Sequence, residues 1–73
     1  MSLQDLTIKL EVILFHAINR LGNNAKVNFL HRFETKGIFP REYSFFSLEG
    51  EGDPMFVEII HERGEVVSVT LLQ

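Results

Sequence analysis

The chain has 73 residues, of which 45% are hydrophobic, and its formal net charge at pH 7 is −3. It contains no cysteine, which excludes disulfide bonds, cysteine nucleophiles and thiolate metal ligands. We expect one small domain, residues 1–73, that is marginally stable and gains buried area by self-association. No signal-peptide pattern is visible in the sequence, so we expect a cytoplasmic protein.

Residues 3–21 (LQDLTIKLEVILFHAINRL) form the longest periodic stretch. Eight of their apolar residues fall on one face of a helix at 100° per residue: Leu3, Leu6, Leu10, Ile13, Leu14, Ala17, Ile18 and Leu21. Ser2 and Asp5 have the spacing of a capping box, and Gly22 stands where a helix commonly closes. We therefore predict one long amphipathic helix, too short and too charged to cross a bilayer.

Three apolar residues depart from this pattern and stack on the otherwise polar side of the helix: Ile8, Val12 and Phe15. Three apolar residues stacked in this way form an exposed patch, and such patches indicate a contact with another surface. Either another part of this chain covers them, or a second subunit or partner does.

Residues 25–36 are ambiguous between two structures. Val27, Phe29, His31 and Phe33 alternate as in a strand, whereas apolar residues at 29, 30 and 33 cluster as in a helix. Gly37 at a C′ position would bring Phe33 against Ile38, as in a Schellman motif, and Pro40 would prevent continuation. We predict a second helix.

Three strands are predicted after residue 41, over residues 42–48, 55–61 and 65–72. A three-residue loop at 62–64 would set Ile59 opposite Val67 and Val57 opposite Val69, giving one apolar sheet face. The resulting fold is an α+β domain of two N-terminal helices followed by a three-stranded antiparallel meander packed on the long first helix. The other sheet face remains half apolar through Phe56 and Ile60, which we add to the predicted interface.

The sequence predicts no enzyme. His16, His31 and His61 come from separate elements without the spacing of a zinc site. Glu49, Glu51 and Asp53 begin like a calcium loop, but position 12 is Ile60, so the pattern fails. We found no activated nucleophile and no phosphate-binding glycine pattern, and we expect no cofactor, metal or small-molecule substrate.

Charge is distributed unevenly along the chain. Residues 1–41 hold six Lys and Arg against three acids, whereas residues 42–73 hold one Arg against seven acids. Such asymmetry indicates polar recognition, for which we single out Arg41, Tyr43, Glu49, Glu51, Asp53, Glu62 and Glu65. An alternative is nucleic-acid binding through Lys26, Arg32 and Lys36 on the second helix, which the acidic net charge disfavours.

The segment GIFPREYS, residues 37–44, followed by a glycine-rich acidic loop and the run VEIIHERGEVV, resembles small bacterial immunity-type proteins. The matching residues are Gly37, Ile38, Pro40, Arg41, Tyr43 and Ser44. The resemblance covers residues 37–67 and lacks the long first helix, a tryptophan in the last strand and a following helix. It implies a non-catalytic protein that binds and blocks another protein. Together with the patch, it predicts a protein–protein interaction domain that acts as a homodimer.

Overall fold

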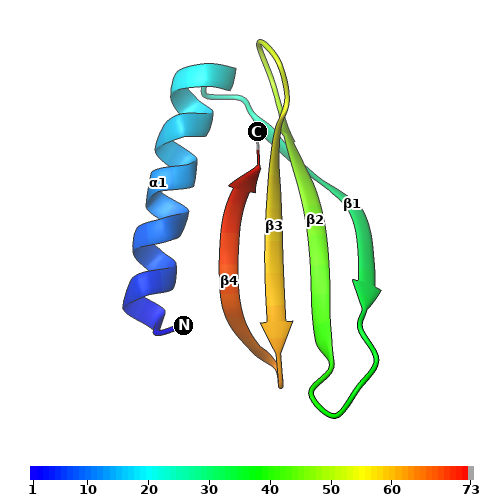
Figure 1. The fold of residues 1–73 in the computed structure, drawn as a ribbon. Coiled ribbons are helices and arrows are strands. Elements are labelled where there is room, and N and C mark those ends of the chain that lie inside the picture. The colour runs from blue at the N-terminus through cyan, green and yellow to red at the C-terminus, as the bar shows by residue number, and fades with distance from the viewer. Residues whose placement is uncertain (73) are drawn as a thin grey trace.

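The computed structural model describes residues 1–72 and contains one helix followed by four strands. They are α1 (Leu3–Leu21), β1 (Lys26–Glu34), β2 (Arg41–Glu49), β3 (Met55–Glu62) and β4 (Glu65–Leu72). The strands form one antiparallel sheet in the order β1-β2-β3-β4, and α1 lies beside β4 (Figure 1). The predicted fold of two helices and three strands is therefore wrong, because the second helix is a strand.

Helix α1 has the predicted bounds and the predicted N-terminal cap. The Ser2 hydroxyl accepts a hydrogen bond from the Asp5 amide at 3.1 Å, which satisfies one of the amides that a helix start leaves free. At the other end, Gly22 adopts a φ of 88°, and its amide donates to the Ile18 carbonyl at 3.0 Å.

The second predicted helix is strand β1, which pairs with β2 from Lys26 opposite Glu49 to Glu34 opposite Glu42. The predicted contact between Phe33 and Ile38 is absent, because Phe33 stacks on Tyr43 of β2 and Ile38 is 89% exposed. The alternation of residues 27–33 was the correct signal. Cross-strand pairing with an aromatic neighbour outweighed the glycine and proline, which instead belong to the connecting loop.

The predicted register of the last hairpin is also wrong. The connection is a two-residue turn, Arg63-Gly64, and both residues have positive φ. The register then shifts between Ile60 and His61, close to the turn. Beyond this shift, Ile59 lies opposite Val69 and Val57 lies opposite Leu71. The extra residue lies in a bulge and not in the turn. The bulge keeps an apolar face toward α1, with Val66 packed against the core.

The core is small and lies toward one side of the sheet. Among the described residues, the buried apolar side chains are Ala17, Leu21, Leu48, Met55, Val57 and Val69. Helix α1 contacts β4 and β2, whereas every residue of β1 is exposed. The helix therefore covers only part of the sheet, and the inner face of the sheet near β1, on the side of α1, is left open.

Candidate functional site

The open part of the inner sheet face forms an apolar groove against α1. Its walls come from Leu10 and Ile13 of α1 and from three strands, β1, β2 and β3, and the cavity volume is about 200 Å³. The sheet residues that line it are Val27, Phe46, Leu48, Val57 and Ile59. None of these lining side chains carries a polar atom, so the groove offers no hydrogen bond and suits an apolar occupant.

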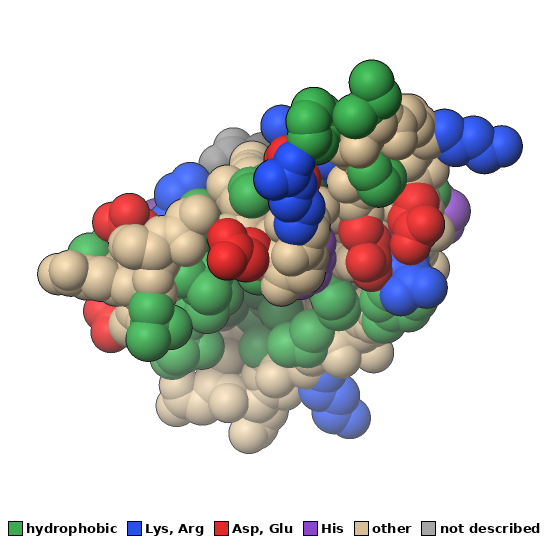
Figure 2. Space-filling view, turned by 90° about the horizontal axis from the view of Figure 1, so that it is seen from below, with side chains coloured by type: hydrophobic (Ala, Val, Ile, Leu, Met, Phe, Trp, Pro, Cys, Tyr) green, Lys and Arg blue, Asp and Glu red, His purple; other side chains and the backbone are tan. Residues whose placement is uncertain are grey.

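Exposed apolar residues continue the groove on both sides. On β1, Val27 is 67% exposed and Phe29 is 60% exposed, and the two lie on the same face of the strand. On α1, Leu14 is 59% exposed and lies one turn beyond Leu10. Figure 2 shows hydrophobic side chains on both sides of a hollow when the molecule is viewed from below. We call this surface, Leu10, Leu14, Val27, Phe29 and Phe46, the open apolar face.

The residues predicted as one interface fall on different surfaces. Ile8 and Val12 lie on the other flank of α1, where they line a shallow pocket with Val69 and Leu71 of β4. Phe15 is 64% exposed and has His16 as an aromatic neighbour. Phe56 and Ile60 lie on the outer face of the sheet, opposite the face that Val57 and Ile59 present to the groove. The fold does not bring these five side chains together.

The predicted polar residues are divided between the two ends of the sheet. Arg41, Tyr43, Glu62 and Glu65 lie near the β3–β4 turn, whereas Glu49, Glu51 and Asp53 lie at the far end of β2 and in the loop that follows (Figure 1). Since β2 separates the two groups along its whole length, they do not form one recognition site.

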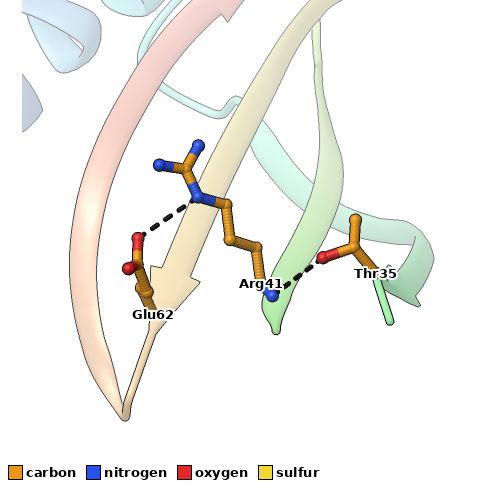
Figure 3. Close-up of polar contacts among 3 residues, drawn as sticks. All are labelled: Thr35, Arg41 and Glu62. Atoms are coloured by element: carbon orange, nitrogen blue, oxygen red, sulfur yellow. Dashed lines mark hydrogen bonds and ion pairs between the residues drawn. The ribbon is translucent and has the colours of Figure 1, made fainter. Parts of the chain in front are cut away.

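Arg41 is held in place by two contacts. Its amide donates to the Thr35 hydroxyl at 2.9 Å, and its Nε donates to the Glu62 carboxylate at 3.2 Å (Figure 3). Interaction with Tyr43, and then the negative charge of Glu62, raise the pKa of Arg41 above its already high value. Arg41 is thus permanently charged. The Thr35 contact closes the β1–β2 connection, and the Glu62 contact joins β2 to β3, so both support the fold.

The acidic loop between β2 and β3 is docked on the helix. The Glu51 amide donates to the Leu21 carbonyl at 2.8 Å, which satisfies one carbonyl that the end of α1 leaves free. Glu49 accepts a hydrogen bond from the side chain of Asn28 on β1. Glu51 thus has a structural contact with the end of α1, and Glu49 has one with β1. Among the described residues, no group of three or more potential ligands could hold a metal ion.

A row of aromatic rings crosses the outer face of the sheet. Phe33 stacks on Tyr43 with ring centres 4.9 Å apart and planes 8° apart, and it also stacks on Phe45 at 6.0 Å. His31 lies 6.2 Å from Phe45 with nearly parallel rings. The sequence reading missed this row because it placed residues 31 and 33 on a helix.

The basic residues proposed for nucleic acid do not form a helical strip. Lys26 and Arg32 lie on β1, and Lys36 follows in the loop. Arg32 makes an ion pair with Glu42 at 3.1 Å, so part of its charge is neutralised within the chain. A recognition helix in residues 25–36 is excluded.

One small cleft of about 130 Å³ lies at the end of the sheet near the β3–β4 turn. It is lined by Glu34, Pro40, Arg41, Glu42, His61, Arg63 and Gly64. The Nδ1 atom of His61 is buried there without a hydrogen-bond partner in the structure. The lining contains no Ser, Thr, Cys or Lys, so no hydroxyl, thiol or amine lies there for His61 to activate as a nucleophile.

The residues that sequence reasoning missed are Val27, Phe29 and Phe46, which form the sheet side of the open apolar face. Their signal was present as apolar residues at alternate positions of 27–33 and in the aromatic run of 42–48. Only the assignment of 25–36 as a strand places them beside one another.

In residues 1–72 there is no helix of the length and apolar character needed to span a bilayer. No protein-family model matches the chain, and no curated protein or solved structure is significantly similar to it.

Proposed function

We propose that this chain is a non-catalytic protein-interaction domain and that the open apolar face is its binding surface. The observation that carries the proposal is a groove whose lining has no polar atom, continued by exposed side chains on α1 and β1. A contiguous apolar surface of this kind is characteristic of a contact with another polypeptide. The resemblance of residues 37–44 to immunity-type proteins supports a role as a binder that blocks another protein.

Site-specific photo-crosslinking in the native cell tests this function. A photoreactive phenylalanine analogue replaces Phe29 in the open apolar face, and a control chain carries it at Ile38, in the exposed β1–β2 loop. We expect a discrete crosslinked adduct from position 29 that is absent from position 38, with mass spectrometry identifying the second polypeptide. Adducts at both positions alike, or at neither, would contradict a binding surface at the groove.

The second candidate function is binding of single-stranded nucleic acid to the aromatic row on the outer face. Stacked, partly exposed rings on a sheet are the surface on which unpaired bases stack. Phe33, Tyr43 and Phe45 provide the rings, and Arg41 lies next to them on the same face of β2. The net charge of −3 weakens attraction to phosphates, so the first candidate is favoured.

Fluorescence anisotropy with a labelled single-stranded oligonucleotide at low salt tests the second candidate function against the first. Binding that Phe33→Ala removes and Val27→Asp leaves intact would support the outer face. Absence of binding at low salt, where electrostatic attraction is strongest, would eliminate nucleic acid as a ligand.

A further inference from the structure

We infer that the occupant of the groove is a second copy of this chain, with α1 of each copy lying along the inner face of β1 and β2 of the other. The inference rests on the proposed function and deepens it by naming the partner. The resulting assembly has two outer sheets and a middle layer of two helices.

The exposed surface of one chain is too large for a compact monomer. The chain exposes 5441 Å². A folded monomer of 8.4 kDa is expected to expose about 4,600 Å², so the excess is roughly 800 Å². A standard stable interface buries about 800 Å² on each partner. Burial of one such interface against a second copy would therefore remove the excess exposed surface of each chain.

The uncovered part of the sheet has the width of one helix. Helix α1 contacts β4 and β2 and leaves the inner face near β1 open. Neighbouring strands lie about 4.8 Å apart, and a helix with its side chains is about 10 Å across, so one helix covers about two strands. The helix of a second copy has the required dimension.

Helix α1 itself is apolar on sides that its own sheet does not contact. Leu14 and Ile18 project toward the groove side, and Phe15 projects from the back, all of them exposed. Apolar residues on a side of a helix that its own sheet does not cover indicate a further contact on that side. In the proposed dimer the groove side meets the partner's helix, and the back meets the partner's β1 and β2.

The exposed apolar side of α1 and the open inner face of β1 and β2 occur on the same chain, as an isologous two-fold dimer requires. The exposed stripe of α1 on one copy meets the exposed strands of the other, and the converse contact follows by symmetry.

Pairing of two β1 edges is the competing arrangement, and the bulge of β1 opposes it. The irregularity between Phe29 and His31 places Val27 and Phe29 on the inner face but Phe33 on the outer face. Two such strands centred on Leu30 would set Val27 opposite Phe33, although these side chains point to opposite faces. Bulges on edge strands commonly prevent pairing of this kind.

Light scattering on a size-exclusion column tests the dimer. We expect the wild-type chain to be a dimer, and Val27→Asp and Leu14→Asp to be folded monomers by circular dichroism. Ile38→Asp adds the same charge at an exposed loop position and is expected to remain a dimer. Unfolding of both groove variants would assign these side chains to the core and overturn the inference. Dimeric behaviour of both would also overturn it.

Measurement of the distance between two electron-spin labels distinguishes a dimer packed through the groove from a dimer paired through its β1 edges. The chain has no cysteine, so His16→Cys provides a single labelling site on a polar part of α1. Helices packed in one layer are about 8–10 Å apart between axes, so we expect a label distance below about 30 Å. Because α1 lies over β2 to β4, edge pairing would separate the helix axes by at least five strand spacings, about 24 Å. His16 lies on the β4 flank of α1, so both labels would then point away from the two-fold axis, and a label distance above about 30 Å would overturn the groove assignment.

Failure of this inference is distinguishable from failure of the proposed function. A wild-type chain that stays monomeric up to about 100 μM overturns the second copy as occupant. If position 29 still crosslinks to a different polypeptide, the proposed function stands with another partner. If the chain is monomeric and position 29 yields no adduct, both are overturned.

Discussion

Gly50 is the residue at which the acidic loop and the end of α1 come into contact. A Cβ atom at this position would lie 2.4 Å from the Leu21 carbonyl oxygen and 3.0 Å from the Leu21 Cβ. Leu21 is the most deeply buried large side chain of the described core. The absence of a side chain at Gly50 thus allows the loop to reach the helix and to place the Glu51 amide on its last carbonyls.

Gly50→Ala is therefore expected to destabilise the fold. The added methyl group displaces backbone, and overpacking of this kind costs about 1–3 kcal/mol in the free energy of unfolding. Urea denaturation at a fixed protein concentration measures the difference. Glu51→Ala is the matched control, because it keeps the backbone hydrogen bond and should change the unfolding free energy by less than about 0.5 kcal/mol. Equal effects of the two variants would show that the close approach at Gly50 is unimportant.

Arg63 and Gly64 illustrate a different residue-scale constraint. Both have positive φ, at 55° and 78°, and a Cβ at Gly64 would meet no atom within 4 Å. The constraint at Gly64 is therefore the backbone angle of the tight turn, whereas at Gly50 it is contact with the helix. Arg63 also places its guanidinium 4.7 Å from the ring centre of Phe39.

At the scale of elements, β1 depends on its neighbour β2. All nine of its residues are exposed, so burial by α1 does not hold it in the sheet. Its contacts are the ladder to β2, the stack of Phe33 on Tyr43 and the edge-on contact of Phe29 with Phe46 at 5.7 Å. Cross-strand aromatic pairs therefore supply the apolar side-chain part of its attachment, beside the Asn28–Glu49 hydrogen bond and the Arg32–Glu42 ion pair.

A double-mutant cycle of Phe33→Leu and Tyr43→Leu measures that attachment. Leucine keeps an apolar side chain but removes the ring stack, so the two losses should not add. We expect a coupling free energy of about 0.5–1.5 kcal/mol from chemical denaturation. Additive losses would show that the parallel rings do not stabilise β1.

At the scale of the whole molecule, the chain leaves much of its apolar surface exposed and buries only a small core. The described core has six buried apolar side chains, and α1 exposes leucines, isoleucines and a phenylalanine on sides away from its own sheet. A domain of this length is marginally stable even when compact. Stability is therefore expected to come partly from association.

Thermal unfolding checks this coupling. For a dimer, association adds to the free energy of unfolding by mass action, so the wild-type Tm should rise as the protein concentration is raised about a hundredfold. Val27→Asp should unfold at a lower Tm that does not depend on concentration, and Ile38→Asp should behave as the wild type. A wild-type Tm that is independent of concentration would contradict a contribution of association to stability.

The sequence alone determined those features of the protein that depend on residues close together in the chain. The bounds of α1, its cap at Ser2, and the strands after residue 41 follow from periodicity, capping residues and turn residues within a few positions. The apolar composition of the inner face, with Val57 and Val69, also followed from alternation.

Only the tertiary structure decided how residues 25–36 fold and which surfaces meet. This segment satisfies both a helix and a strand pattern locally, and the pairing of Phe33 with Tyr43, ten residues away, selects the strand. The bulge after Arg63-Gly64 shifted the hairpin register, because an extra residue in a strand changes every pair beyond it. The groove combines α1, β1, β2 and β3, so no local pattern could reveal it. Its apolar lining exists only where distant segments come together, and that depends on the packing of the whole chain.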